Sequence, residues 1–428
     1  MDIVAASIPL FFGLIAVEFA VARVRGRRVH GLSDSISDLS LGILSQLTGL
    51  FITLLTYGLF AWVSGNLDIQ RFLPVPDWPS GAPLTSPAAF ASWAAVFLLV
   101  DLCYYWSHRL SHRVHLLWAG HVVHHSSEEY NLTVALRQSS LHGLFTWAFY
   151  MPLALLGVPW VMFAVCHGLN LIYQFWIHTR EVGRLGPLEW FMNTPSHHRV
   201  HHGINPRYQD RNYAGVFIIW DRLFGTFTPE DEEPVYGITT PLATWNPLWA
   251  NVHVFVDIAR QAGRTERWRD KLGVIFSPPA WRPADLGGPV TIPEVSATTF
   301  EKYDPPIAAG VKWYALVQFV AVLAGTLVAL KAAEQLPGWQ LAAIVFYIAL
   351  SLSNLGSLLE SAPWVRPLET ARLVTMIAAS AVLLILAQRF NPTGVLAVGV
   401  FGIVSLGWFS TLGGERSRVT SHESREGS

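Results

Sequence analysis

Charged residues are scarce in this sequence. Asp, Glu, Lys and Arg make up 14% of its 428 residues, whereas hydrophobic residues make up 52%. An average soluble domain carries about 25% charged residues. Because the apolar residues gather into long runs, the shortage predicts a polytopic membrane protein. The formal net charge is −1 and no basic nucleic-acid motif is present, so we expect no nucleic-acid partner.

Cysteine and lysine are also rare. Cys103 and Cys166 both lie in apolar runs, which predicts two buried thiols rather than a disulfide framework. The four lysines stand against 25 arginines, a bias that favours a GC-rich and bacterial source. No small-residue cleavage site follows the first apolar run, so we expect that run to remain as a membrane span.

The apolar runs predict an all-α, polytopic membrane helical bundle of about nine apolar helices, since about 20 helical residues cross a hydrocarbon core of about 30 Å. Four arginines within residues 23–28 place the end of the first run in the cytoplasm under the positive-inside rule. Residues 144–177 are interrupted by Gly157 and Pro159 and predict a helical hairpin that returns to the side it left. The expected runs are residues 3–22, 38–63, 88–106, the hairpin 144–177, 313–333, 339–359, 370–388 and 393–412.

Three segments are expected along the chain. Residues 1–87 hold the N-terminal spans and a proline-rich external loop, residues 88–310 the catalytic region, and residues 311–428 the C-terminal spans and a polar tail. The alternation of basic loops places the histidine-rich cap and the C-terminus in the cytoplasm. The expected location is therefore a bacterial inner membrane, or the endoplasmic reticulum if the source is eukaryotic.

Histidine is concentrated in one stretch: 13 of the 16 histidines fall within the 95 residues from 108 to 202. Neutral imidazole is the commonest side-chain ligand of transition metals. Spacings of three and four residues place two rings on one helical face, and nine or ten rings suit two ions rather than one. The candidate metal ligands are His108, His112, His121, His124, His125, His178, His198, His201 and His202, with His197 possible.

Two carboxylates are candidates for supporting the ligands. Asp101 lies seven residues before His108 on the same helical face, and we expect it to accept a hydrogen bond from a histidine N–H. Glu128 follows the second cluster, and we expect it to bond a histidine there. Alternatively, Glu128 and Glu129 lie in a solvated turn, or one of them is the base of a zinc hydrolase.

The order H-x3-H, H-x2-H-H, isolated His and H-x2-H-H resembles the fatty acid hydroxylase and sterol desaturase superfamily of membrane di-iron oxygenases. Longer sequence motifs resemble the branch of this superfamily that oxidises alkylglycerol ether lipids, and examples are Trp118-Ala-Gly-His121 and Asn193-Thr-Pro-Ser-His-His-Arg-Val-His-His-Gly203. The resemblance covers about residues 95–240. Some superfamily members carry a further histidine where this chain has Gln174.

The resemblance implies two iron ions, dioxygen and a membrane lipid as substrate, with tetrahydrobiopterin or another reductant as electron donor. No stretch is identified as a pterin site. The implied activity is a monooxygenase that hydroxylates the ether-bearing carbon of an alkylglycerol, which yields a fatty aldehyde and a glycerol derivative.

Two other functions fit the same sequence. A superfamily member of this fold hydroxylates or desaturates a sterol, a fatty acyl chain or a carotenoid. A protein of another class binds zinc without turnover, as a carrier does, although cysteine, methionine or carboxylates along a span are more typical of that class. No feature of the sequence specifies an oligomeric state.

Overall fold

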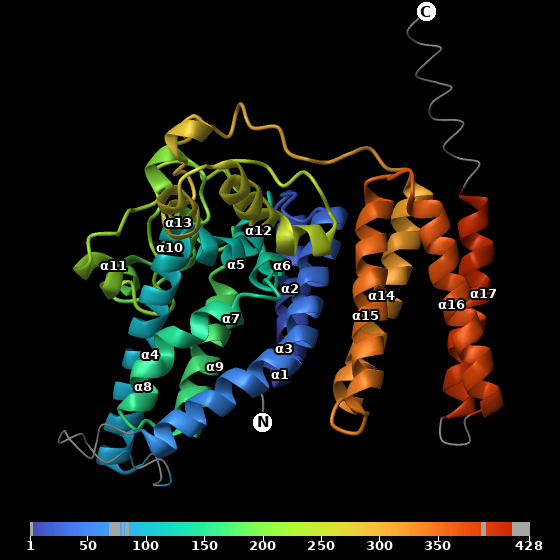
Figure 1. The fold of residues 1–428 in the computed structure, drawn as a ribbon, viewed down its shortest axis with the longest axis horizontal. Helices are drawn as coiled ribbons and strands as arrows, with labels where there is room; N and C mark the ends of the chain where they lie inside the picture. The colour runs from blue at the N-terminus through green and yellow to red at the C-terminus, as the bar shows by residue number, and fades with distance from the viewer. Residues whose placement is uncertain (1–2, 68–77, 79–80, 82–84, 387–390, 413–428) are drawn as a thin grey trace, which may run out of the picture. The chain divides into compact units, whose positions relative to one another are not determined.

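The regular secondary structure in the part of the chain that the structure describes is helical, with loops between the helices (Figure 1). The structure is a computed structural model, and it describes residues 3–67, 78, 81, 85–386 and 391–412. Within these residues the only extended pairings are two isolated β-bridges, Met192 with Phe217 and Gly203 with Tyr236. The all-α prediction is therefore confirmed. Most of the proline-rich loop and the polar tail after Gly413 lie outside the described residues.

Six helices in the described part are long and apolar enough to cross a membrane, so the expected count of about nine is not confirmed. The first apolar run is divided into α1 and the 17-residue α2, and the hairpin consists of α7, α8 and the 17-residue α9. Seventeen residues of helix span only about 26 Å, less than the hydrocarbon core. The six candidate spans are α3 (Leu32–Asn66), α4 (Pro87–Arg113), α14 (Ala309–Ala332), α15 (Gly338–Leu359), α16 (Val365–Leu386) and α17 (Pro392–Thr411).

The chain forms two compact units, and the first comprises residues 1–243 and 249–302. Its apolar core lies where α4 packs against α9. Val96 and Val100 of α4 are buried there with Phe163 and Cys166 of α9, and Phe60 of α3 stacks on Phe163 with ring centroids 4.2 Å apart. This packing fixes the ends of α4 and α9, from which histidines project.

The helix α4 continues seven residues beyond the expected end of its span at residue 106, so that His108 and His112 lie on the helix itself. Val114 is extended (φ −122°, ψ 120°) and turns the chain directly into α5. The second cluster therefore lies next to the first. The remaining elements of this unit are α1 (Ile3–Ala6), α2 (Ile8–Val24), α5 (His115–His125), α6 (Leu132–Ala135), α7 (Gly143–Thr146), η2 (Trp147–Tyr150), α8 (Met151–Leu155), α9 (Trp160–Trp176), η3 (Gly186–Trp190), α10 (Pro195–His201), η4 (Pro206–Tyr208), α11 (Ile219–Leu223), α12 (Pro247–Arg264), α13 (Trp268–Phe276) and η5 (Ala284–Leu286).

The second unit comprises residues 244–248 and 303–428, and its described helices are the four apolar helices α14 to α17. Contacts join α14 to α15, α15 to α16, and α16 to α17. Figure 1 shows these four helices running alongside one another. No histidine lies in any of them, so every candidate ligand belongs to the first unit.

Candidate metal centre

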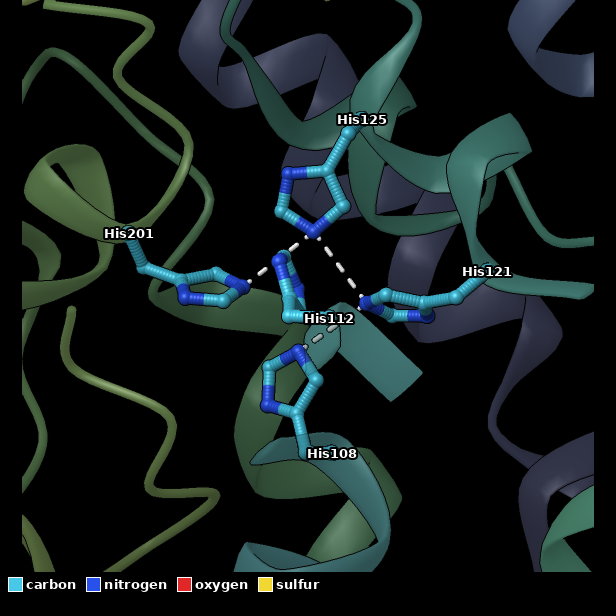
Figure 2. Close-up of side chains that lie close together, drawn as sticks. All are labelled: His108, His112, His121, His125 and His201. Carbon is cyan, nitrogen blue, oxygen red and sulfur yellow. Dashed lines mark hydrogen bonds between the residues drawn. The ribbon is translucent and has the colours of Figure 1, made fainter. Parts of the chain in front are cut away.

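The nine histidines predicted as ligands form two groups of side chains. Within each group, one ring nitrogen from every residue lies within 4.8 Å of those of the others, an arrangement that could hold a metal ion. The first group consists of His108, His112, His121, His125 and His201, and the second of His124, His178, His198 and His202. Figure 2 shows the five rings of the first group directed toward a common point.

Helix periodicity decides which group each histidine joins. On α5, His121 and His125 are one turn apart and join the first group, whereas His124 joins the second. On α10 and its C-cap, His201 joins the first group, whereas His198 and His202 join the second. The helices α5 and α10 therefore each supply ligands to both groups, which places the two candidate ion sites side by side.

The ring nitrogens within each group face one another at close range. In the first group, the Nε2 atom of His121 lies 3.0 Å from that of His108 and 3.1 Å from that of His125. In the second, the Nε2 atom of His178 lies 3.1 Å from that of His124 and 3.0 Å from that of His198. Two nitrogens bound to one ion at about 2.1 Å and a right angle are separated by about 3 Å.

Backbone carbonyls fix the tautomers of four of these rings. A carbonyl only accepts a hydrogen bond, so a neutral imidazole whose Nδ1 contacts one carries its proton on Nδ1 and directs the Nε2 lone pair inward. The four contacts are His108 Nδ1 with Tyr213 O (2.7 Å), His124 Nδ1 with Arg137 O (3.1 Å), His178 Nδ1 with Gln174 O (2.7 Å) and His201 Nδ1 with Arg211 O (2.9 Å).

The donor set fits a bound cation. His124 and His178 both direct lone pairs at each other, a repulsive arrangement that a cation between them relieves. The buried Nε2 atoms of His112 and His202 have no hydrogen-bond partner among the described residues. Burial lowers the pKa of His178 to about 3 and that of His201 to about 4, which keeps both rings neutral, as a ligand must be.

The ligand atoms are all imidazole nitrogens, which are typical of iron, copper, nickel and zinc sites rather than of magnesium or calcium sites. Cys103 and Cys166 are free thiols and belong to neither histidine group. His197 also lies outside both groups, with its Nε2 3.9 Å from Glu189 Oε2 and its ring edge-on to Phe227. The structure therefore places the alternative ligand away from the centre.

Asp101 is buried near the centre, but its hydrogen-bond donors are not histidines. Its carboxylate accepts bonds from Asn170 Nδ2 (2.6 Å), Val216 N (2.9 Å), Phe217 N (3.0 Å) and Trp220 Nε1 (2.9 Å). The prediction that Asp101 accepts a hydrogen bond from a histidine N–H is therefore wrong. Seven residues along a helix correspond to a rise of about 10 Å, too far for a direct bond to His108.

Asp101 and Asp221 together hold the loop that supports His108. Asp221 accepts bonds from the backbone N–H groups of Tyr213 and Ala214, each at 2.8 Å, while Asp101 holds Val216 and Phe217. A Cβ atom at Gly215 would lie 2.9 Å from Asp101 Oδ1, so the close approach of the loop favours glycine there. The loop thereby presents the Tyr213 carbonyl to His108.

The glutamates after the second cluster lie outside both histidine groups. Glu129 forms an ion pair with Lys302 (Oε1 to Nζ 2.6 Å), and Lys302 also pairs with Asp34 at 2.7 Å. Glu128 is half-buried and is the adjacent residue. Because its carboxylate is paired with Lys302 and lies outside both histidine groups, Glu129 is not placed to act as the base of a hydrolase there.

Several supporting residues were not predicted from the sequence. Arg137 is buried and donates to Asp38 and Ser126 while its carbonyl accepts from His124. Glu18 of α2 accepts bonds from Leu132 N (2.8 Å) and from the hydroxyl of Thr179, the residue after His178. Backbone carbonyls leave no mark in a sequence, but a buried acid within an apolar run is a signal that could have identified Glu18.

Comparison with known proteins agrees with this architecture. The profile of the family described as fatty acid hydroxylase matches residues 93–226, which contain all nine histidines of the two groups. The helical membrane fold and the paired histidine groups define the chain as a fatty acid hydroxylase-type membrane protein.

Individual relatives identify the branch. The chain is 40% identical to the alkylglycerol monooxygenase of Homo sapiens over 374 residues, which cover 87% of this chain and 81% of that protein. The corresponding figures for the Xenopus tropicalis alkylglycerol monooxygenase are 39%, 87% and 80%, and for the Danio rerio protein 39%, 90% and 81%. The chain belongs to the alkylglycerol monooxygenase family. No solved structure matches the chain.

Proposed function

We propose that this protein is a membrane di-iron monooxygenase that hydroxylates the ether-bearing carbon of alkylglycerol lipids. The observation that carries the proposal is the convergence of nine histidines from four segments into two ion-sized groups, in a chain similar over most of its length to alkylglycerol monooxygenases. The histidine clusters and the fatty acid hydroxylase profile together indicate di-iron binding.

The residues of the chain divide the work. The five-histidine and four-histidine groups would each hold one iron, and the two ions supply dioxygen activation when they are bound. Burial of the rings excludes water from this chemistry. The carbonyls of Tyr213, Arg137, Gln174 and Arg211 orient four of the ligands. A hydroxyl group on the ether carbon makes a hemiacetal, which collapses to a fatty aldehyde and a glycerol derivative.

The orientation in the membrane and the electron donor belong to the same proposal. The arginines after α2 support a cytoplasmic location for the histidine groups, and with it a cytoplasmic C-terminus. We assign the catalytic region to residues 88–310, flanked by the segments 1–87 and 311–428. Tetrahydrobiopterin or another soluble two-electron reductant would serve as donor, in a bacterial inner membrane or in the endoplasmic reticulum.

The test is product analysis under labelled dioxygen. The purified protein, loaded with ferrous iron in nanodiscs, is incubated with a 1-alkylglycerol, a sterol or a fatty acyl lipid in the presence of a reductant and 18O2. We expect a fatty aldehyde that carries 18O, which is retained when the aldehyde is reduced at once to its alcohol with borodeuteride. A hydroxylated sterol or acyl chain would identify the related superfamily activity instead.

Metal analysis of the same sample tests the alternative that the protein binds zinc without turnover. We expect about two iron ions per chain and oxygen consumption that depends on lipid. Zinc without oxygen consumption after reconstitution with iron would support a binding protein or carrier and overturn the oxygenase. An ether hydrolase would release a fatty alcohol without 18O or deuterium, which mass spectrometry distinguishes from the labelled alcohol made from the aldehyde.

A further inference from the structure

A polar cavity of about 700 Å³ lies on the side of α10 that faces away from the histidines. Small-molecule sites have volumes of about 300–1,000 Å³. The arginines of its lining are Arg27, Arg28, Arg180, Arg184 and Arg199, and its acidic residues are Glu230, Asp231, Glu232 and Glu233. Arg27, Arg28 and Arg184 are exposed, so the cavity opens to solvent.

One helix separates this cavity from the metal centre. Arg199 of α10 lines the cavity, and its guanidinium donates to both oxygens of Glu230, at 2.6 and 2.7 Å. His198 and His201 of the same helix belong to the two histidine groups. A molecule in the cavity would therefore lie behind the helix that carries three of the nine ligands.

Stacked aromatic rings connect the cavity to the second histidine group. Tyr236 lines the cavity and stacks on Tyr130, with ring centroids 4.8 Å apart and planes 11° apart. Tyr130 is fully buried, stacks on His178 at 5.8 Å, and lies 5.2 Å from the ring of His202. Two tyrosine rings thus form a continuous aromatic path from the cavity wall to two metal-ligand candidates.

We infer that this cavity is the binding site of the reductant, and that Tyr236 and Tyr130 carry its electrons to the metal centre. The inference rests on the proposed function. The lining offers cationic donors and carboxylate acceptors side by side, which suits a small, planar, reduced nitrogen heterocycle with both donor and acceptor edges. The size of the cavity favours such a molecule over a protein electron donor.

The electron balance of the reaction requires this supply. Dioxygen places one oxygen atom into a lipid C–H bond and releases the other as water, which consumes two electrons and two protons. The heterocycle in the cavity provides them and leaves oxidised by two electrons. The cavity and the buried lipid carbon can lie on opposite sides of α10, because only electrons and protons need to pass.

The first experiment measures binding without turnover. The metal-free, full-length protein in nanodiscs is titrated with tetrahydrobiopterin under anaerobic conditions, and tryptophan fluorescence reports binding. We expect the double variant Arg28→Gln, Glu232→Gln to bind about tenfold more weakly than wild type, since two exposed polar contacts of the lining are weakened. Binding unchanged in this variant would overturn the assignment of the cavity.

The second experiment separates electron supply from oxygenation. In the iron-loaded protein, oxidised to the ferric state, stopped-flow absorbance follows reduction by tetrahydrobiopterin. We expect Tyr236→Leu to lose most of the reduction rate and Tyr236→Phe, which keeps the ring, to retain it. Iron content near that of wild type shows that each variant has folded around its centre. A wild-type rate in Tyr236→Leu would overturn the electron path.

Peroxide keeps the inference distinct from the proposed function. Hydrogen peroxide supplies oxygen at the reduction level that dioxygen reaches after two electrons, so it bypasses the reductant. We expect peroxide-driven aldehyde formation to be the same in wild type and Tyr236→Leu. If wild type makes no aldehyde with any oxidant but the binding and reduction results hold, the proposed substrate fails and the reductant site stands.

Discussion

The two units of this protein both bury polar side chains among apolar helices, but the hydrogen bonding of these side chains differs between the units. In the second unit, Glu369 of α16 is fully buried and accepts hydrogen bonds from Arg372, Tyr314 and Asn354. Arg372 also donates to Gln318 of α14, at 2.6 Å. The charged groups are paired there, although the Oδ1 atom of Asn354 has no partner among the described residues, and the cluster joins α14, α15 and α16 without need of a ligand.

The histidine groups of the first unit show the reverse. In four of these rings the outer nitrogen is satisfied by a carbonyl, while the inner nitrogens face each other as unmatched lone pairs. Burying acceptors without donors is unfavourable unless a cation binds. The comparison teaches that a buried polar cluster indicates a ligand site when unpaired lone pairs converge on one point. When its donors and acceptors pair with one another, the cluster is a structural contact between helices.

The largest effect should follow the loss of one converging ring. The Nε2 atom of His125 lies 3.1 Å from that of His121 and 3.2 Å from that of His201. We expect His125→Ala, or likewise His201→Ala, to abolish aldehyde formation and to lower the iron content, measured by product chromatography and elemental analysis. His253→Ala is the control, because His253 belongs to neither group. Full turnover in His125→Ala would refute the ligand role.

The ligands were predictable because histidine spacing is a local property. Rings three or four residues apart share a helical face, so the sequence alone assigns His121, His124 and His125 to a metal centre. Helix periodicity separates His124 from His121 and His125, but which histidines of the other segments join each group could not be predicted, because it depends on where α10 and the residue His178 meet α5. That meeting is set by the packing of α4 on α9, which is not local.

The membrane fold was predictable in class but not in count. Hydropathy identifies long apolar runs, yet it does not reveal that the first run divides at Ser7 or that the hairpin consists of short helices. The role of Asp101 was not predictable either. Its helical face follows from the sequence, but its partners include two backbone N–H groups of a loop more than 100 residues later.

The second prediction tests whether the cluster of Glu369 and Arg372 has only a structural role in the second unit. Replacing Arg372 by Met leaves Glu369 as an unpaired buried charge, which should destabilise the unit by about 3–5 kcal/mol. The double variant Glu369→Met, Arg372→Met removes both charges and should recover most of this loss. Unfolding in nanodiscs followed by fluorescence measures the difference. The iron content of the folded fraction should not change. A loss of iron would show that the cluster of Glu369 and Arg372 also stabilises the metal centre.

Metal removal should separate the two units by stability. A ligand present at 100 times its dissociation constant stabilises the folded state by about 2.7 kcal/mol, and only the unit that binds it gains. After chelation, we expect faster hydrogen exchange in peptides from α5 and α10 and unchanged exchange in α14 to α17. Restoring ferrous iron should restore protection. Uniform changes across both units, or none, would contradict a metal centre confined to the histidine groups.

The smallest effect should come from the residue that acts on the centre through a loop. Asp101→Asn retains the side-chain size but weakens the bonds to Val216 and Phe217, so the Tyr213 carbonyl holds His108 less firmly. We expect iron affinity to fall by about 10–100-fold, the range for residues that orient metal ligands. Competition with a chelator measures it, and the half-exposed Asp210→Asn is the control. Unchanged affinity would mean that Asp221 alone fixes the loop, and that Asp101 only joins α4 to the loop.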